Sequence, residues 1–457
     1  MNIKKMTVAA LAATTTASLA AAVPQVGNDV TMTQSSGGRT VTITYTLSDA
    51  PAVVTLEVQT NANTSAGADD PGWTSIGGAA VSNAKGDVWK RVETGSRTIT
   101  WRPDLSWPDH IVPNGGARAV VTAWALDNTP DYMVADISSA AQPNTQTYYP
   151  AADFVPGGVS NSLYKTTTLI MRKIMAKDVK WTMGSTTLET QRTAAREATH
   201  QVTLTNNYYI GVYQVTQAQW ALLQPSRSAP SGFNNATDRA MRPVENVCYN
   251  EIRNSEYAAS PDPAYNWPAN PNPSSFLGQL RSKTGLDFDL PSEAQWEFAA
   301  RAGNGDTKWG NDSGIMNTEK DVNLDLFGRY ERNGGRVHGG GTTYSDPDMS
   351  CGAANATAIV GSYAPNAWGL YDTSGNLWEW CLDWMEDNIT ANEGKINIDP
   401  SAPAKTLSGA SGGNRVLRGG SWYNAAGGCR PAMRSASAPN TRNIYSGFRV
   451  LCYAGLR

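Results

Sequence analysis

Histidine is scarce in this sequence, with only three residues in 457: His110, His200 and His338. No two of them are close in sequence, so the paired histidines that mark many zinc hydrolases are absent. A two-histidine, one-carboxylate iron site is disfavoured for the same reason, although distant residues could still meet in space. No Gly-x-Ser-x-Gly elbow precedes a predicted helix, which leaves a Ser-His-Asp triad with little support.

Strong charge and long hydrophobic runs are also missing. The net charge is −3 without a long charged run, which gives no electrostatic footprint for nucleic acid or an anionic membrane. The apolar stretch from Met6 to Leu19 is too short to span a bilayer. Two lysines precede it and three alanines follow it, which is typical of a secretory signal over residues 1–22. We therefore expect an extracytoplasmic protein (secreted, periplasmic or at the cell surface) that begins near Val23.

Cysteine is rare and odd in number. In an oxidising compartment some of the five can pair, but at least one must stay free or bond elsewhere. The sequence does not fix the pairing. Phenylalanine is likewise rare (seven) beside 15 Trp and 18 Tyr, and such aromatics suit half-buried loops and binding surfaces as well as cores. The cysteines are Cys248, Cys351, Cys381, Cys429 and Cys452.

The length predicts two or three domains. Residues 23–145 contain short alternating segments separated by Gly, Asn, Pro and Asp, a pattern that predicts an immunoglobulin- or fibronectin-type-III-like β-sandwich. We expect this domain to be a spacer or docking module, by analogy alone. Residues 146–164 have linker composition, and residues 165–457 form the second domain. The predicted sandwich strands are 41–47, 53–58, 97–101 and 119–124.

Two short amphipathic helices are predicted in the second domain. Thr216 and Ser292 each stand before an apolar run with glutamine three residues later, which is a capping box. Glu293 and Glu297 lie one helical turn apart, and we interpret them as a solvated face rather than a catalytic pair. Residues 225–280 and 303–360 are rich in Pro, Asn, Gly and Ser, so we expect long surface loops there.

The last forty residues hold the most informative stretch. Residues 416–417 are predicted to form a short buried strand. Gly419 and Gly420 then allow a tight turn with backbone conformations that residues with a side chain disfavour. Residues 423–446 are small or polar with almost no apolar periodicity, which predicts an irregular loop. Residues 447–451 return to a strand. A long loop held between two strands is usually functional.

These residues resemble the C-terminal signature of the formylglycine-generating enzyme, or sulfatase-modifying factor, family. Other blocks of that signature occur in family order, so the resemblance covers about residues 165–457. It implies an α+β, C-type-lectin-like fold with little regular structure and long ordered loops. The blocks are WTMGS (181–185), YIGVYQVTQ (209–217), RPVEN (242–246), LPSEAQWEF (290–298), NAWGLYDTSGNLWEW (366–380), RVLRGGSWYN (415–424), CRPAMR (429–434) and GFRVLC (447–452).

The resemblance also implies a structural Ca²⁺ site. Its ligands would be the side chains of Asp372 and Glu379 and the main-chain carbonyls of Gly375 and Leu377. Ca²⁺ takes six to eight hard oxygen ligands, which these groups supply in part. The alternative is that Asp372 and Glu379 only cap a turn.

The enzymes of this family bind Cu(I) through two cysteines of the last loop. The second of these positions is Cys429 in this chain, but the first is Asn424. Ser421 and Trp378 match residues around the family's active site. A thiolate with an amide does not suit Cu(I), so we do not expect a copper cofactor. Two other cysteines could replace the missing ligand only if the fold brought them within reach: Cys381 and Cys452.

We therefore favour a non-catalytic protein that presents the 423–446 loop to a protein or surface ligand, through Tyr423, Asn424 and Asn443. The loop contains no Lys, Gln, Glu, Asp or Trp, and it resembles the variable region of diversity-generating-retroelement proteins, although Met433 departs from that pattern. One alternative is a copper-dependent oxidoreductase that forms formylglycine on sulfatases or oxidises another thiol, using Cys429, Ser421 and Trp378. Another is a purely structural envelope protein.

Overall fold

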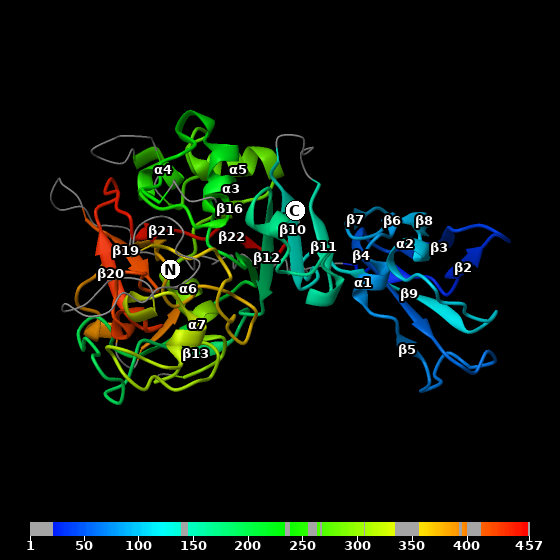
Figure 1. The fold of residues 1–457 in the computed structure, drawn as a ribbon, viewed down its shortest axis with the longest axis horizontal. Coiled ribbons are helices and arrows are strands. Elements are labelled where there is room, and N and C mark those ends of the chain that lie inside the picture. Colours follow the sequence, from blue (N-terminus) through cyan, green and yellow to red (C-terminus); the bar gives the residue numbers. More distant parts are fainter. Residues whose placement is uncertain are drawn as a thin grey trace, which may run out of the picture.

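The computed structural model shows a smaller N-terminal lobe beside a larger lobe (Figure 1). The predicted signal falls almost wholly outside the described residues, as do His338 and Cys351. Within the ranges that are described, no helix has the length and apolar character needed to cross a membrane. The structure describes residues 22–138, 145–233, 238–254, 263–265, 267–305, 307–333, 356–392, 395–399 and 413–455.

The smaller lobe consists of two mainly antiparallel sheets, and all four strands predicted there are confirmed. Every second residue of β3 is buried, as the alternating sequence predicts. Ile43, Leu56 and Ile99 from the two sheets lie in one core. One sheet holds β1 (Gln25–Val26), β2 (Thr31–Gln34), β3 (Val41–Ser48), β6 (Lys85–Gly86) and β8 (Gly95–Trp101); the other holds β4 (Ala52–Thr60), β5 (Thr74–Ser75), β7 (Arg91–Val92) and β9 (Ala117–Trp124). Two single-turn helices, α1 (Gly78–Val81) and α2 (Pro103–Ser106), pack against each other.

A six-stranded sheet forms the part of the larger lobe nearest the smaller one (Figure 1). Its strand β10 pairs with β12 over five residues, from Tyr132 opposite Arg172 to Asp136 opposite Thr168. Residues 132–136 therefore belong to the sheet of the larger lobe, although the predicted boundary at 145 assigned them to the first domain. The order is β11 (Thr147–Tyr149), β10 (Tyr132–Asp136), β12 (Thr168–Ile174), β15 (Tyr208–Gly211), β22 (Leu451–Tyr453) and β16 (Phe288–Asp289).

Two smaller sheets complete the larger lobe. Together with the helices described below, they make this lobe a mixture of α and β structure. Strand β20 lies inside the loop predicted to be irregular, and it pairs antiparallel with β19. Its short, mostly small side chains gave no sequence signal for a strand. One sheet contains β13 (Lys180–Met183), β14 (His200–Thr203) and β18 (Ile396–Ile398); the other contains β20 (Arg434–Ser437), β19 (Arg415–Arg418), β17 (Trp378–Trp384) and β21 (Ser446–Gly447).

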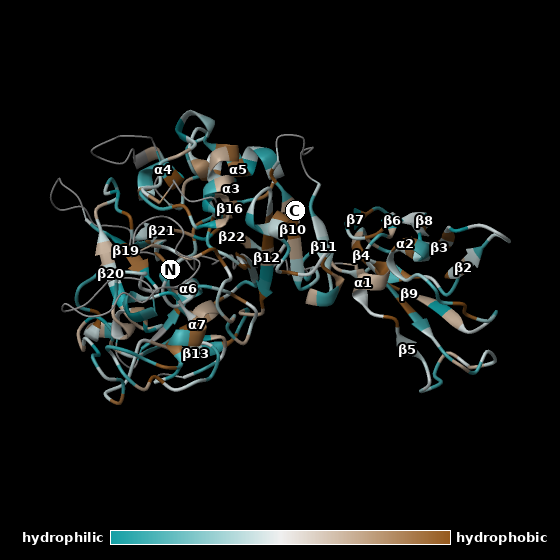
Figure 2. Ribbon diagram, viewed as in Figure 1, coloured by the Kyte–Doolittle hydropathy of each residue, from teal (hydrophilic) through white to brown (hydrophobic). Residues whose placement is uncertain are grey.

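Both predicted helices and their capping boxes are confirmed, as α3 (Gln217–Leu223) and α6 (Glu293–Arg301). The prediction of long surface loops is wrong for three segments: α4 (Tyr249–Arg253), α5 (Phe276–Thr284) and α7 (Leu324–Phe327). Helix α5 starts at the N-cap Ser275 and ends at Gly285, which takes a left-handed conformation with φ 68°. Figure 2 shows hydrophobic residues on α5, where Leu277 and Leu280 enter the main core.

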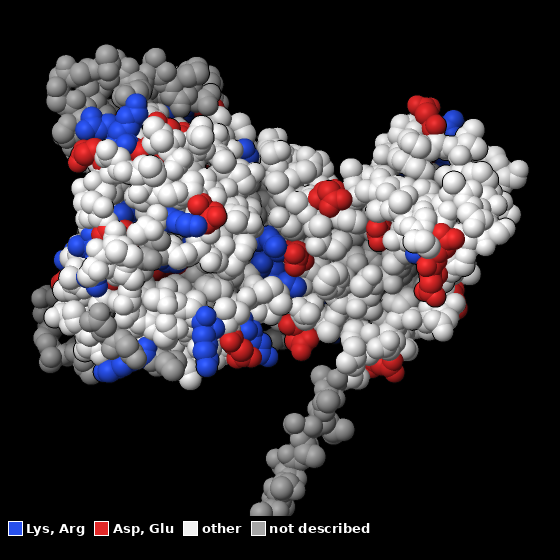
Figure 3. Space-filling model, turned by 90° about the horizontal axis from the view of Figure 1, so that it is seen from below, with Lys and Arg blue, Asp and Glu red and all other residues white. Residues whose placement is uncertain are grey.

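The interpretation of Glu293 and Glu297 as a solvated helix face is wrong, because both side chains are buried. Arg301 donates to Glu297 at 2.8 Å, and Arg418 pairs with both glutamates. A buried carboxylate is tolerated when such partners neutralise it. On the surface, basic and acidic side chains are interspersed over the face drawn in Figure 3.

Candidate functional site

The turn that opens the last loop depends on two glycines. Gly419 and Gly420 have φ of 94° and 72°, a region that favours glycine. A Cβ atom on Gly420 would lie 2.6 Å from the Cys429 sulfur and 2.6 Å from a main-chain oxygen. The tight turn predicted from the sequence is therefore confirmed, and it lets Cys429 pack directly against the backbone that leads into Ser421.

Asn424 closes this turn with its side chain. Its Oδ1 atom accepts hydrogen bonds from the Ser421 hydroxyl at 2.7 Å and from the Ser421 N–H at 3.1 Å. Its main-chain oxygen accepts from the N–H of Glu331 at 2.9 Å. The amide of Asn424 is thus committed to local structure at the position where the resembling enzymes carry a cysteine.

Cys429 is fully buried, and its sulfur lies 4.0 Å from the main-chain oxygen of Ser421. Burial raises the pKa of its thiol to about 12, so the thiolate is scarce at neutral pH. Neither of the two substitutes lies in its cluster: Cys381 packs with Trp296 and Val416, and Cys452 lies in the main core. One protonated thiol beside a committed amide does not fit Cu(I), which prefers soft, deprotonated sulfur ligands.

Trp378, the third residue matched to the family's active site, lies at the start of β17 and is buried. Its main-chain N–H donates to the main-chain oxygen of Tyr445 at 2.9 Å, which fixes the far end of the last loop. The structure therefore places Ser421, Asn424 and Cys429 in one turn, and Trp378 under the other end of the same loop.

Three of the four exposed residues of the loop are aromatic or apolar, and the fourth is Asn440. Tyr423, Ile444 and Tyr445 are 40%, 39% and 38% exposed, and we call these three residues the rim. The rings of Tyr423 and Tyr445 stack with centroids 5.8 Å apart. Trp422 supports them from below, with its ring edge-on to Tyr423 and its indole N–H bonded to the Ile444 oxygen at 2.9 Å. Phe233 packs edge-on against Trp422 in turn.

Asn443, the remaining predicted binding residue, shapes the rim. Its Oδ1 accepts from the N–H of Tyr445 at 3.1 Å, and its main-chain oxygen accepts from the N–H of Asn246 at 2.8 Å. Sequence reasoning named Tyr423 but missed Ile444 and Tyr445. Two large side chains standing together in an otherwise small and polar segment were the signal that could have found them.

Beneath the rim, three arginines of the loop hold it to the rest of the lobe, and we call them the floor: Arg430, Arg434 and Arg442. Arg430 is fully buried and donates to Glu197 at 2.9 and 3.1 Å, and also to Glu189. Arg434 makes a two-point pair with Glu293 at 2.5 and 2.7 Å.

Arg442, the third residue of the floor, makes a two-point pair with Glu251 at 2.8 and 2.9 Å. Two-point arginine–carboxylate pairs fix geometry as well as charge. The floor therefore orients an otherwise irregular loop.

Three of the four residues expected to bind Ca²⁺ meet at the buried amide of Gln214, which the sequence did not flag; no contact of the Gly375 oxygen with this amide occurs in the described residues. Gln214 Nε2 donates to Glu379 Oε1 at 2.9 Å, to the Leu377 oxygen at 3.1 Å and to the Asp372 main-chain oxygen at 3.4 Å. Its Oε1 atom is buried without a hydrogen-bond partner among the described residues. Because an amide can turn by 180°, Oε1 can join these three oxygens around one point, an arrangement that fits a hard cation.

Two features differ from the ligand set that the resemblance implies. The Asp372 carboxylate accepts from the N–H of Gly361 at 2.8 Å, and it is the main-chain oxygen of Asp372 that faces Gln214. The Glu379 carboxylate is shared with Arg449, which donates to it at 2.6 and 2.7 Å. Burial raises the pKa of Asp372 to about 6, a shift that a bound cation would oppose.

Comparison with known sequences identifies relatives of the larger lobe. Residues 167–454 match the family described as the sulfatase-modifying factor enzyme 1-like domain. A formylglycine-generating enzyme from Thermomonospora curvata is 30% identical over 244 residues, which cover 51% of this chain and 64% of that protein. Its counterpart from Bos taurus is 32% identical over 165 residues, or 35% and 37% of the two chains. The chain thus spans less than two thirds of the length of these curated relatives.

Solved structures give two further comparisons. Treponema denticola variable protein 1 has 27% sequence identity and a TM-score of 0.44, over 63% of this chain and 95% of that one. PvdO from Pseudomonas aeruginosa has 22% identity and a TM-score of 0.41, over 62% and 94% of the two chains.

Proposed function

The chain belongs to the sulfatase-modifying factor family, and we propose that it is a non-catalytic member that binds a protein or surface ligand through its 423–446 loop. The observation that carries this proposal is the exposed rim of Tyr423, Ile444 and Tyr445, whose two tyrosine rings stack on each other and rest against buried Trp422, in a loop held by the ion pairs of the floor. Aromatic side chains that are both rigid and exposed supply much of the binding energy at protein interfaces.

The rim is already organised for binding. The stacked pair of Tyr423 and Tyr445 has few rotatable bonds, and Trp422 and Phe233 restrain it from below. A tyrosine gives a large contact area at a small entropy cost, together with a hydroxyl that can pair with polar ligands. Asn443 and Asn424 set the backbone on either side, so substitutions there should change recognition indirectly.

The alternative function, a copper-dependent oxidoreductase acting on sulfatases or another thiol, has family membership in its favour. Its catalytic residues would be Cys429, Ser421 and Trp378. We regard it as the weaker proposal because Asn424 replaces the first copper-binding cysteine and the Cys429 thiol is buried with a raised pKa. Supplying the second thiol with Asn424→Cys should raise Cu(I) affinity sharply in a competition titration, whereas the wild-type chain should bind Cu(I) only weakly.

Several further properties belong to this proposal. The larger lobe would be a C-type-lectin-like scaffold braced by Ca²⁺ at Leu377 and Glu379, close to Asp372 and Gly375. The smaller lobe would be an immunoglobulin- or fibronectin-like spacer. The signal-like segment over residues 1–22 supports an extracytoplasmic location, which exposes the rim to external ligands. N-terminal sequencing of exported protein should then begin at or near Val23.

Binding is tested by removing the rim while keeping the fold. The mature chain, its Tyr423→Ser/Tyr445→Ser variant and a Tyr453→Ser control are applied to arrays of glycans and extracellular proteins. Tyr453 is also an exposed tyrosine, but it lies outside the loop. We expect some array components to bind the wild type and the control specifically. For those components, the signal of the rim variant should be lower by about tenfold or more. Signals that survive in the rim variant would contradict the proposal.

A further inference from the structure

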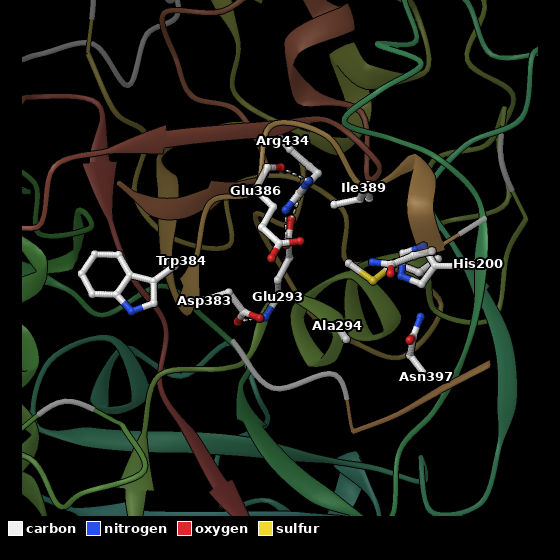
Figure 4. A pocket seen from close by; sticks show the side chains of 11 residues that line it. His200, Glu293, Ala294, Asp383, Trp384, Glu386, Ile389, Asn397 and Arg434 are labelled. Carbon is white, nitrogen blue, oxygen red and sulfur yellow. Dashed lines mark hydrogen bonds and ion pairs between the residues drawn. The ribbon is translucent and has the colours of Figure 1, made fainter. Parts of the chain in front are cut away.

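A second site lies away from the rim, in a cavity of about 290 Å³ (Figure 4). It is bounded by the start of α6, the end of β17, the strands β13, β14 and β18, and the start of β20. Apolar walls come from side chains such as Ala294 and Ile389, and polar groups converge from several strands. A concave, partly apolar space with a few converging polar groups is typical of a small-molecule site.

Two of the charged lining residues satisfy each other. Glu293 and Arg434 form the two-point pair of the floor, and Arg418 approaches Glu293 at 3.2 Å from behind. Burial opposes the charge on Glu293, but Arg434 and Arg418 hold its pKa below the ordinary value. This pair forms a fixed wall of the cavity and leaves little charge for a ligand.

Asp383 is the exception among the buried lining groups. It is 7% exposed, and its only hydrogen bond within the described residues comes from the Glu293 N–H to Oδ2, at 2.6 Å. No lysine, arginine or histidine of the described chain forms an ion pair with it, unlike Glu293 and Glu297. An unpaired carboxylate held away from bulk water is stabilised by a cation that enters beside it.

Two further groups that line the cavity have unused hydrogen-bonding capacity. His200 Nδ1 lies 3.0 Å from the Ala198 oxygen, and since a carbonyl only accepts, Nδ1 carries the hydrogen of the neutral ring. This leaves His200 Nε2 as an acceptor without a partner in the part of the chain described. The Nδ2 atom of Asn397 is buried and also lacks a hydrogen-bond partner. The cavity thus offers two acceptors and one donor.

We propose that this cavity binds a small molecule carrying a primary ammonium group beside a hydroxyl or carbonyl oxygen. Asp383 receives the ammonium group, and Asn397 Nδ2 donates to the neighbouring oxygen. A divalent metal ion fits less well, because Glu293 is held by Arg434 and a single unpaired buried carboxylate provides too few hard oxygens. The site is separate from the rim, so its fate does not depend on the proposed function.

Binding of such an amine should depend on pH. Burial and the charge of Glu293 raise the pKa of Asp383 to about 7, so acidification removes the charge that the ammonium group needs. The other titratable or charged groups around the site are His200, Arg434, Arg415, Arg418 and Glu386. We expect affinity about tenfold lower near pH 6 than near pH 8.

The test is an NMR titration of the full mature chain with ethanolamine, and with ethylene glycol as its uncharged match. We expect ethanolamine to bind at millimolar concentration and ethylene glycol not to bind. Asp383→Asn keeps an acceptor for the Glu293 N–H and should weaken ethanolamine binding by about tenfold or more. The matched control Asp387→Asn removes an exposed carboxylate that pairs with Arg196, and it should leave binding unchanged.

A second variant keeps the proposal testable if Asp383→Asn does not fold. Asn397→Ala should weaken binding of ethanolamine but not of ethylamine, which lacks the oxygen that Asn397 would contact. Failure of ethanolamine to bind the wild type, equal binding of ethylene glycol, or undiminished binding by Asp383→Asn would each overturn the assignment. So would an equal effect of Asn397→Ala on both amines.

Discussion

The rim and the floor belong to one loop, yet they differ in almost every physical respect. Tyr423, Ile444 and Tyr445 are each exposed by more than a third. Arg430 and Arg434 are buried and tie the same loop to glutamates more than 100 residues away. The contrast shows how a loop with little regular secondary structure can be held in place, because ion pairs fix its base while its tip stays exposed.

This division separates recognition from stability. A buried ion pair adds little net stability compared with a well-packed apolar pair, but loss of one partner leaves a buried charge unmatched. Substitutions in the floor should therefore lower the free energy of unfolding. Substitutions in the rim should mainly lower the affinity for the ligand.

The largest expected effect comes from Arg430→Met. It strands Glu189 and Glu197 in the interior without their cation, and we expect the free energy of unfolding to fall by about 3–5 kcal/mol. Urea denaturation measures this loss. Arg196→Met, which breaks an exposed pair with Asp387, should cost about 1 kcal/mol or less. Equal losses of stability from the two substitutions would show that the buried ion pairs of the floor matter no more than an exposed pair.

Calcium removal comes next, because the cation would brace the strand that carries Trp378. A ligand bound only by the folded state stabilises it by about 2.7 kcal/mol at a hundredfold excess over its Kd. We expect a chelator to lower the melting temperature of the wild type. Glu379→Gln should reduce that response, because Glu379 Oε1 is one of the three oxygens around Gln214, whereas the Asp372 carboxylate is bonded to Gly361.

Asp387→Asn is the control for calcium, since it removes an exposed carboxylate that pairs with Arg196 and should keep the chelator response. A wild-type melting curve that does not change in chelator would leave Arg449 and Gln214 as the partners of these oxygens.

A smaller effect is expected at Glu245, which lies beside Gly232, a neighbour of the rim residue Ile444. Glu245 is buried, its Oε2 has no hydrogen-bond partner within the described residues, and burial raises its pKa to about 7. Because the folded state then holds a proton that the unfolded state has lost, wild-type stability should fall as pH rises from about 4.5 to about 7. Glu245→Gln should remove this slope and gain about 1–3 kcal/mol above pH 7.

Urea denaturation across this pH range compares the two proteins directly. Parallel curves for wild-type protein and Glu245→Gln would show that the carboxyl group has the same pKa in the folded and unfolded states.

The smallest effect on stability belongs to the rim itself. Tyr423→Ser should change the free energy of unfolding by about 1 kcal/mol or less, since Tyr423 is 40% exposed and belongs to none of the hydrophobic clusters of the described residues. Trp422→Ala, one residue earlier but buried, should cost about 3–5 kcal/mol. Thermal unfolding of both variants checks the contrast, and a large loss from Tyr423→Ser would mean that the rim is part of the core.

Sequence reasoning succeeded where structure is determined locally. The capping boxes at Thr216 and Ser292 lie within four residues, and both helices formed as predicted. The glycine turn at residues 419–420 and the alternating strand at residues 41–48 are equally local.

Sequence reasoning failed where partners are distant. Glu293 and Glu297 have the spacing of an exposed helix face, and only Arg418 and Arg434, far along the chain, make their burial possible. Gln214 gave no local sign that it lies among the oxygens of the predicted Ca²⁺ site. The floor was invisible for the same reason, since its arginines looked like ordinary polar residues of a surface loop.

Mass spectrometry can show whether this loop works without copper chemistry. A peptide with the cysteine of a sulfatase motif is incubated with the wild-type chain, copper and oxygen. Because Asn424 is bonded to Ser421 and the Cys429 thiol is buried, we expect the peptide cysteine to remain unchanged. Conversion of that cysteine to an aldehyde would overturn the non-catalytic assignment and show that another residue supplies the missing ligand.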